Sequence, residues 1–298
     1  MRRPAALLAF AALMAAGCAA GEPQPPPTSS EETPPAARAE EAAQAPAAAP
    51  VPMRRLRAEV VATYPHDPGA FTQGLELAPG DPGTLLESTG NYGASELRRV
   101  DLASGEPMRR LALPRDLFAE GLTLVPGAGG APGVLVQLTW REGVALLWDS
   151  ATFERRGEHR YAGEGWGLCY DAAGDRLVMS DGSAELVFRD PRTFAETGRV
   201  EVDLDGRPAR GMNELECVDG RVWANLYGRD YLAEIDPESG RVIALADARG
   251  LLGDAGGFRA DVMNGIAHDP ADGTFLVTGK WWPKLFRVRL VPAAAAPP

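Results

Sequence analysis

Apolar positions in this chain fall into short runs that return at a nearly constant interval. A phrase of seven residues, largely apolar but broken by polar residues, recurs about every 47 residues. The copies read FTQGLEL at 71–77, FAEGLTL at 118–124, EGWGLCY at 164–170, MNELECV at 212–218 and MNGIAHD at 263–269. Aligning Gly74, Gly121, Gly167, Leu215 and Gly265 gives steps of 47, 46, 48 and 50 residues. A period of this length is typical of repeat architectures.

Each repeat divides into short strand-like runs separated by turn residues. Leu, aromatic and β-branched residues alternate with polar ones, and Gly, Asp and Pro bound the runs. The first repeat predicts strands at 74–77, 84–88, 95–102 and 107–113, and the fourth at 215–218, 221–226, 231–235 and 241–246. No segment of the repeats keeps a 3.6-residue apolar period over the length of a helix. The pattern therefore predicts an all-β fold with four strands per repeat.

Five such repeats predict a five-bladed β-propeller over residues 54–292. The last repeat offers three strand-like runs, whereas Arg57–Thr63 precedes the first repeat and is itself strand-like. We expect this N-terminal strand to complete the last blade and close the ring, because closure removes exposed sheet edges. A two-sheet sandwich is the alternative, but its strands would not carry a blade-length period.

The first 53 residues do not belong to the predicted fold. Arg2 and Arg3 precede a short apolar stretch that ends in Ala-Ala-Gly-Cys18, which predicts a signal peptide over 1–18. The motif resembles a bacterial lipobox, and this implies a lipidated Cys18; ordinary cleavage near Ala20 is the alternative. Residues 19–53 are rich in Pro, Ala and Glu and predict a disordered tether, as do 293–298 for a tail. We expect an exported protein, periplasmic or at the cell surface, that is anchored to the membrane through Cys18.

Charge and composition exclude several partners. The formal net charge of -11 argues against nucleic acid, whose phosphates need a basic surface, and favours a soluble monomer. The three His, at 66, 159 and 268, have no metal-ligand spacing, so neither a metal nor another cofactor is expected. Cys169 and Cys217 lie at similar places in neighbouring repeats, a separation usually too large for a disulfide. We expect two buried free thiols, with a disulfide as the alternative.

Polar residues interrupt each copy of the repeated phrase where a purely structural inner strand would be small and apolar. They are Gln73, Glu120, Trp166, Asn213, Glu214 and Asn264. Because these residues occupy similar places in successive repeats, a closed ring would gather them around one axis. Their identity differs from copy to copy, which predicts one asymmetric pocket on that axis.

An ordered set of short phrases runs through all five repeats. It comprises PHDPGAFTQGL at 65–75, LESTGNYG at 86–93, FAEGLT at 118–123, QLTW at 137–140, EGWGL at 164–168, SDG at 180–182, NELE at 213–216, VWAN at 222–225, NGI at 264–266 and TGKWWP at 278–283. Together they resemble the plant and bacterial glutaminyl-peptide cyclotransferase family, the papaya-latex type. The resemblance covers about Val60 to Val288. It implies a five-bladed propeller that converts the N-terminal glutamine of peptides and proteins to pyroglutamate and releases ammonia. It also implies the metal-independent class, distinct from the zinc-bound α/β animal cyclases.

The chemistry implied by this resemblance suggests roles for individual residues. Glu120 is the expected acid/base, because a carboxyl group in a poorly solvated cavity can shuttle a proton. Lys280 is the expected partner of the oxyanion, although it could instead bind substrate or pair with Glu120. Neutral amides can hold the substrate carboxamide without competing as charges, and an aromatic collar can exclude water. The amides are Gln73, Gln137, Asn213 and Asn264, and the collar is Phe71, Trp140, Trp166 and Trp281.

Structural roles compete with each of these assignments. Glu214 could hold the α-ammonium group of the peptide, and Glu87 could be a structural hydrogen-bond acceptor. Trp148 and Trp223 are expected in the core. Two other functions remain open at this level: a non-catalytic binding or scaffold propeller, and a lactonase-like hydrolase using a metal on axial carboxylates and amides.

Overall fold

The computed structural model describes residues 52–127, 129 and 131–294. The predicted signal peptide, Cys18 and nearly all of the predicted tether lie outside these residues. Within them η2 (Gly253–Gly256) is a short 3-10 turn, and no helix is long and apolar enough to cross a bilayer. The described part of the chain is therefore all-β, as the apolar pattern predicts.

Three antiparallel sheets of four strands follow one another along the chain, each in sequential strand order. The first contains β2 (Thr72–Leu77), β3 (Thr84–Thr89), β4 (Glu96–Asp101) and β5 (Pro107–Ala112). The second contains β6 (Ala119–Val125), β7 (Val134–Thr139), β8 (Val144–Asp149) and β9 (Arg155–Arg160). The third contains β10 (Leu168–Asp171), β11 (Arg176–Met179), β12 (Glu185–Arg189) and β13 (Glu196–Glu201).

The remaining long strands form one eight-stranded sheet, in the order β16-β17-β18-β19-β1-β22-β21-β20. Its strands are β16 (Met212–Val218), β17 (Arg221–Leu226), β18 (Tyr231–Ile235), β19 (Val242–Asp247), β20 (Met263–Asp269), β21 (Thr274–Gly279), β22 (Lys284–Pro292) and β1 (Arg54–Pro65). The N-terminal strand β1 is antiparallel to β22 along most of its length and parallel to β19 over Arg54–Arg57. A two-stranded ribbon, β14 (Asp203–Leu204) and β15 (Arg207–Pro208), precedes β16.

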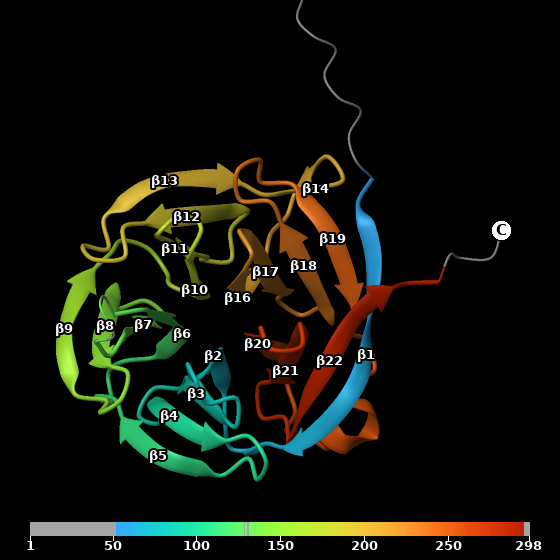
Figure 1. Cartoon of the computed structure of the whole chain (residues 1–298). Helices are drawn as coiled ribbons and strands as arrows, with labels where there is room; N and C mark the ends of the chain where they lie inside the picture. Colours follow the sequence, from blue (N-terminus) through green and yellow to red (C-terminus); the bar gives the residue numbers. More distant parts are fainter. Residues whose placement is uncertain (1–51, 128, 130, 295–298) are drawn as a thin grey trace, which may run out of the picture. The chain divides into compact units, whose positions relative to one another are not determined.

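The first strand of each four-strand unit lies toward a common centre (Figure 1). These inner strands touch in succession: β2 contacts β6 and β20, β10 contacts β6 and β16, and β16 contacts β20. A shift of register recurs in four of them, between Thr72 and Gly74 in β2 and at matching places in β6, β16 and β20. Such bulges re-aim side chains, here toward the centre of the domain.

The same register corrects one detail of the repeat alignment. Because Met212 pairs with Leu226 and Met263 pairs with Gly279, Glu214 and not Leu215 occupies the place of Gly265. The residue before this place is then Gln73, Glu120, Trp166, Asn213 or Asn264 in successive units. Five of the six residues that interrupt the phrase therefore share one structural position, and Glu214 occupies the next one.

Glycine is needed at the repeated place because neighbouring inner strands pass very close to it. A Cβ on Gly167 would lie 1.9 Å from the carbonyl oxygen of Asn213, and one on Gly74 would lie 2.5 Å from the backbone nitrogen of Leu122. Glu214 is the exception. Its fully buried carboxylate accepts hydrogen bonds from the Leu75 backbone N–H at 3.1 Å and the Ile266 N–H at 2.8 Å. The Glu214 side chain thereby links three inner strands, β16, β2 and β20.

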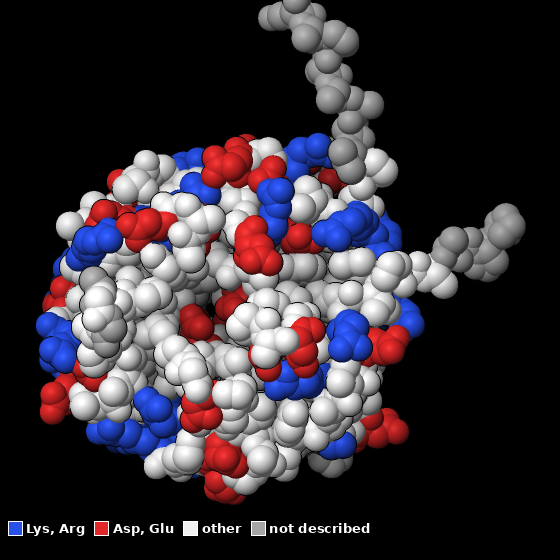
Figure 2. All heavy atoms as spheres, viewed as in Figure 1, with Lys and Arg blue, Asp and Glu red and all other residues white. Residues whose placement is uncertain are grey.

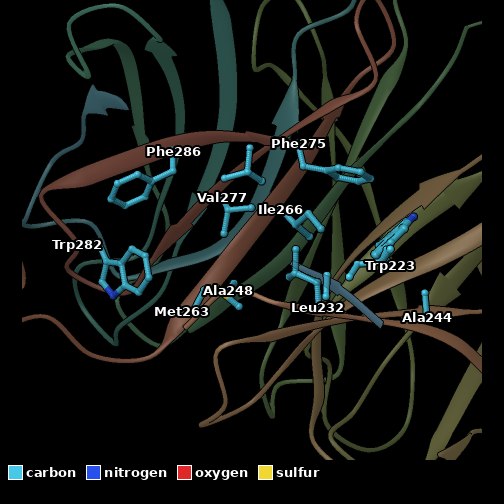
Figure 3. Close-up of a cluster of buried hydrophobic side chains, with 13 residues drawn as sticks. Trp223, Leu232, Ala244, Ala248, Met263, Ile266, Phe275, Val277, Trp282 and Phe286 are labelled. Carbon is cyan, nitrogen blue, oxygen red and sulfur yellow. The ribbon is translucent and has the colours of Figure 1, made fainter. Parts of the chain in front are cut away.

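Apolar side chains pack between neighbouring four-strand units. In the cluster of Figure 3, Trp223 lies against Phe275, with ring centroids 5.1 Å apart, and Trp282 packs edge-on against Phe286. Trp148 is buried in another such cluster with only 6% of its surface exposed. Trp148 and Trp223 are thus core residues, as expected, and Trp282 joins them.

The two cysteines of the domain form a disulfide, so the expectation of two free thiols is wrong. Cys169 on β10 and Cys217 on β16 have Cα atoms 5.4 Å apart, within the range that a disulfide requires. The expectation failed because it used the spacing of whole repeats. Inner strands lie much closer together than the outer parts of their sheets.

Removing this cross-link is expected to destabilise the domain. A bridge between residues 48 positions apart restricts the unfolded chain, so a Cys169→Ser/Cys217→Ser variant should lose about 2–4 kcal/mol of unfolding free energy. Denaturant unfolding of the oxidised wild type and the variant measures this loss. Reduced wild type should unfold like the variant, and equal midpoints for oxidised wild type and variant would contradict the prediction.

Candidate active site

A cavity of about 300 Å³ opens where the inner strands begin. It is lined by Phe71, Gln73, Asn91, Phe118, Glu120, Trp140, Trp166, Asn213, Tyr227 and Lys280. A volume of this size matches a small polar side chain with part of its backbone rather than a large ligand. Its aromatic walls and few polar groups are typical of a small-molecule site.

Three recurring positions supply most of this lining. The residue before the repeated glycine gives Gln73, Glu120, Trp166 and Asn213, and the residue three before it gives Phe71 and Phe118. The residue directly after the second strand of a unit gives Trp140, Tyr227 and Lys280. In this last position the backbone N–H of Trp140 donates to Phe118 and that of Lys280 to Val262. These bonds close each hairpin beside the cavity and fix where its side chains begin.

Glu120 is the central carboxyl group of the cavity. It is only 5% exposed, and burial raises the pKa of Glu120 well above its ordinary value, although the Lys280 cation opposes this and Glu164 and Glu142 reinforce it. Its Oε1 accepts a hydrogen bond from Gln73 Nε2 at 2.9 Å. Burial therefore favours the protonated form of this carboxyl group more than water does, which is the direction that an acid/base carboxyl group needs.

A chain of amides orients Glu120. Asn264 Nδ2 donates to Gln73 Oε1 at 3.1 Å and to the Thr72 carbonyl at 3.0 Å, which leaves the Gln73 amide nitrogen directed at Glu120. Since Oε1 of Glu120 is occupied as an acceptor, a proton on this carboxyl group belongs on Oε2. The network thus fixes which oxygen exchanges the proton.

Lys280 is held mainly by aromatic faces. Its Nζ lies 4.7 Å from the ring centre of Phe71 and 5.4 Å from that of Tyr227, within the range of cation–π attraction. Burial lowers the pKa of Lys280, while Glu120 and Asp261 act to raise it. The cation is thus placed on the cavity wall with its donors available to a developing negative charge.

Asn213 contributes an acceptor that lacks a partner. Its Oδ1 is buried at the cavity, and no described residue donates a hydrogen bond to it. Leaving a buried acceptor unpaired costs free energy unless a ligand satisfies it. The cavity therefore offers one carboxyl group, one cation and one amide nitrogen directed at the carboxyl group, and the unpaired Asn213 Oδ1 is buried in a residue of its wall.

Comparison with known proteins identifies the family of the chain. The family model described as glutamine cyclotransferase matches residues 35–290. The chain belongs to the glutamine cyclotransferase family. A protein of Arabidopsis thaliana called glutaminyl-peptide cyclotransferase is 40% identical over 242 residues, which are 80% of this chain and 72% of that relative. The crystal structure of Myxococcus xanthus glutaminyl cyclase is 40% identical, with a TM-score of 0.73 over 82% of this chain and 100% of that one.

In this member of the glutamine cyclotransferase family, most residues predicted for the site meet at the cavity. Glu120 and Lys280 lie there with Phe71, Gln73, Trp140, Trp166 and Asn213. Two others lie one layer behind it. Asn264 is fully buried behind Gln73, and the Trp281 ring packs 4.7 Å from Phe71 without lining the cavity. Both support residues that do line it.

Two predicted substrate ligands lie away from the cavity. Gln137 is fully buried, donates to Ser88 Oγ at 2.8 Å and accepts from Trp148 Nε1 at 3.0 Å. Glu214 accepts only the two backbone N–H groups described above and does not line the cavity. Their contacts are those of residues that join neighbouring strands and sheets. Glu87 also has structural partners, since His66 and Thr72 both bond its Oε1.

Three lining residues were not among the predicted site residues: Asn91, Phe118 and Tyr227. Phe118 stands in the second repeat where Phe71 stands in the first, so the same alignment could have identified it. Tyr227 occupies the position after the second strand that also supplies Trp140 and Lys280. Asn91 has a φ of 105° in the turn after β3, a conformation that sequence alone does not reveal for this residue.

A second cavity, of about 470 Å³, lies at the other end of the inner strands and shares no lining residue with the first. Its walls include Glu76 and Glu216, each of which accepts a hydrogen bond from a backbone N–H of the next inner strand, that of Leu124 and that of His268 respectively. Figure 2 shows one face of the domain, with acidic side chains inside a central hollow and charges of both signs around it. The described residues contain no group of three or more His, Cys, Asp or Glu that could hold a metal ion.

These interior carboxyl groups predict how stability depends on pH. Burial raises the pKa of Glu76, Glu214 and Glu216 above the ordinary value of 4.5. Such groups bind protons more tightly in the folded state than in the unfolded state. Their contribution to the free energy of unfolding is therefore complete below the ordinary pKa and is lost as pH rises through the raised pKa. We expect Tm to fall from mildly acidic toward alkaline pH, and Glu216→Gln to flatten this fall.

Thermal unfolding at a series of pH values measures this effect. Glu154→Gln, which removes an exposed carboxylate, is the matched control and should leave the slope as in the wild type. Parallel Tm profiles for Glu216→Gln and the wild type would contradict the assignment.

Proposed function

We propose that this protein cyclises the N-terminal glutamine of peptides and proteins to pyroglutamate and releases ammonia. The observation that carries the proposal is Glu120, a buried carboxyl group of raised pKa in a small aromatic cavity that is also lined by Lys280 and three amides. Membership of the glutamine cyclotransferase family and the likeness to solved glutaminyl cyclase support it. The reaction transfers the side-chain acyl group to the peptide's own α-amine.

The reaction needs one proton to be moved twice. The neutral α-amine attacks the side-chain carbonyl carbon and forms the ring C–N bond, while its surplus proton passes to Oε2 of Glu120 in the ionised form. The tetrahedral intermediate then collapses, the bond to the amide nitrogen breaks, and Glu120 returns the proton to that nitrogen, which leaves as ammonia. Glu120 ends in its starting state, so no external acid, base or redox partner is consumed.

Neighbouring residues stabilise charge and fix the substrate in this scheme. The Lys280 cation stabilises the oxyanion that exists only in the tetrahedral intermediate and its flanking transition states. Asn213 Oδ1, which has no described partner, accepts a hydrogen bond from the substrate's amine or carboxamide. The aromatic walls exclude water and strengthen both interactions.

We also propose the finer architecture and the setting. The four-strand units and the pairing of β1 with β22 support a five-bladed propeller whose ring is closed by the N-terminal strand. A metal-independent mechanism is supported by Glu120, Lys280 and the amides, which between them provide every role that the reaction requires. Export, lipidation at Cys18 and anchoring of a monomer to the membrane follow from the N-terminal sequence and net charge.

One assay tests the reaction. The purified protein is incubated with a glutamine-initiated dipeptide amide, with and without a chelator, and both ammonia and the pyroglutamyl product are measured. Equal amounts of ammonia and product, unaffected by the chelator, are expected. A folded protein that forms neither refutes the proposed activity, and activity lost on chelation and restored by metal refutes metal independence.

A further inference from the structure

One carboxylate oxygen near the cavity accepts hydrogen bonds from two tryptophans of the cavity wall. Glu164 Oε2 accepts a hydrogen bond from Trp140 Nε1 at 2.8 Å and another from Trp166 Nε1 at 3.0 Å. Its Oε1 accepts from Arg141 Nε at 3.0 Å. Both indoles line the cavity, whereas Glu164 does not. The contact is therefore made behind the surface that a substrate would touch.

The two tryptophans come from different sheets, so the contact fixes one sheet relative to the next. Trp140 directly follows β7, and Trp166 precedes β10. The backbone reinforces this link, because Gly165 N–H donates to the Trp140 carbonyl at 2.9 Å and Trp166 N–H donates to Ser180 at 3.0 Å. Glu164 thus begins a short segment that is already bonded to both sheets.

Other contacts confine each indole on its remaining sides. The Arg141 guanidinium lies 3.6 Å from the Trp140 ring centre, and Phe118 packs on the same indole at 5.5 Å. Trp166 packs against Tyr227 at 5.7 Å and lies so close to Gly182 that a Cβ there would be 2.5 Å from the ring. The rings are stacked from several directions, but only Glu164 engages both N–H groups.

We propose that Glu164 is a positioning residue that locks Trp140 and Trp166 into one rigid wall around the glutamine side chain. The inference rests on the proposed function, because it concerns the same cavity. Since both indole N–H groups are already engaged, the tryptophans present only apolar surface to the substrate. Recognition of the carboxamide then falls to Gln73, Asn213, Lys280 and Glu120, and the wall sets the orientation of the γ-carbonyl toward the α-amine.

A purely electrostatic role is the competing explanation. The charge of Glu164 helps to raise the pKa of Glu120, and so does that of Glu142. The two explanations differ in what they require of the side chain. Positioning needs an oxygen at the reach of both indoles, whereas the electrostatic role needs only a negative charge nearby.

Two substitutions separate reach from charge. Glu164→Gln keeps an acceptor oxygen at the same distance and loses the charge, whereas Glu164→Asp keeps the charge and is one methylene too short to reach both indoles. The side chain is 36% exposed, so both variants are expected to fold, and Tm checks this. Glu142→Gln is the matched control, because Glu142 bonds Tyr92 and the Phe118 backbone but neither tryptophan.

The expected result is a loss in Glu164→Asp that exceeds the loss in Glu164→Gln. Misplacing a substrate by about 1 Å can cost about 100-fold, so kcat of Glu164→Asp should fall about 10- to 100-fold. Glu164→Gln and Glu142→Gln should each stay within about threefold of wild type at their own pH optima. Both should shift the pH profile of kcat/KM to lower pH, because each removes a charge that raises the pKa of Glu120.

A double-mutant cycle tests whether Glu164 acts through its hydrogen bond to the Trp166 indole. In a Trp166→Phe background one of the two N–H groups is already absent, so Glu164→Asp should cost less than in the wild type. Equal costs in both backgrounds, or a Glu164→Asp variant as active as wild type, overturn the inference. A larger loss in Glu164→Gln than in Glu164→Asp overturns it in favour of charge. A wild-type protein that forms no pyroglutamate refutes the proposed function instead.

Discussion

Glu120→Gln is expected to lower the kcat of ammonia release by about 100- to 10,000-fold, the usual contribution of a positioned acid/base. The substituted amide keeps an oxygen that accepts from Gln73 Nε2, so the chain of amides behind it survives. It cannot exchange a proton between the attacking and the leaving nitrogen. Initial-rate assays with a glutamine-initiated dipeptide amide measure this loss.

The fold should tolerate the same change. Burial already favours the neutral form of Glu120, so a neutral isostere should move Tm by less than about 4 °C, the shift that 1 kcal/mol produces in a domain of this size. Glu142→Gln, which changes a nearby carboxylate outside the cavity lining, is the control and should retain most activity. If Glu120→Gln keeps more than a tenth of wild-type kcat, or unfolds, Glu120 is not the acid/base.

Gly167→Ala is expected to produce the largest loss of stability. The added Cβ would lie 1.9 Å from the carbonyl oxygen of Asn213 and 2.9 Å from the Cα of Glu214, both part of the backbone of β16. Relieving this clash requires β10 and β16 to separate, so we expect a loss of about 3 kcal/mol or more in unfolding free energy. Denaturant unfolding measures the loss, and turnover should fall too, because Asn213 moves with its strand.

Gly83→Ala is the matched control for this substitution. A Cβ on Gly83 would meet only Asp81 Oδ1, at 3.5 Å, which is ordinary van der Waals contact. The backbone there lies outside the left-handed region, so the change should stay within about 1 kcal/mol of wild type. If Gly167→Ala is as stable as Gly83→Ala, the two strands approach less closely than described.

The strands could be predicted well because their signals are local. Alternation and turn residues predicted 221–226 and 231–235, which are the bounds of β17 and β18. The bulges of the inner strands could not be predicted, because a shift of register depends on the partner strand. For this reason the alignment assigned the glycine place to Leu215, whereas the pairing of β16 assigns it to Glu214.

The residues of the candidate site could be predicted where the position in the repeat determines which way a side chain points. Gln73, Glu120, Trp166 and Asn213 share one place in the repeat and reach the cavity, whereas Asn264, at the same place in the last repeat, lies behind Gln73. Gln137 lies on a second strand, whose side chains alternate between packing layers, and its direction depends on how the sheets meet. Tyr227 and Asn91 follow strands in turns, where backbone geometry and not apolar pattern decides what faces the cavity.

The disulfide is a further feature that spacing along the sequence could not predict. A spacing of 48 residues suggests separate blades, yet the Cα atoms of Cys169 and Cys217 are 5.4 Å apart, because both lie on inner strands. Distance along the chain says little about distance near a common centre. The same crowding explains why glycines are required there.

Because the buried Glu214 carboxylate joins β16 to β2 and β20, we expect the candidate cavity to be closed at its inner end and not to form a tunnel. The two cavities at the ends of the inner strands share no lining residue, so we expect a peptide to enter and its products to leave through the same mouth. A polypeptide substrate cannot pass through a cavity that has one opening. A glutamine in the middle of a polypeptide would need both flanking segments to leave by the same opening, whereas a terminal one needs room for a single strand. Selectivity for chain ends is then a matter of geometry before any recognition of the free amine.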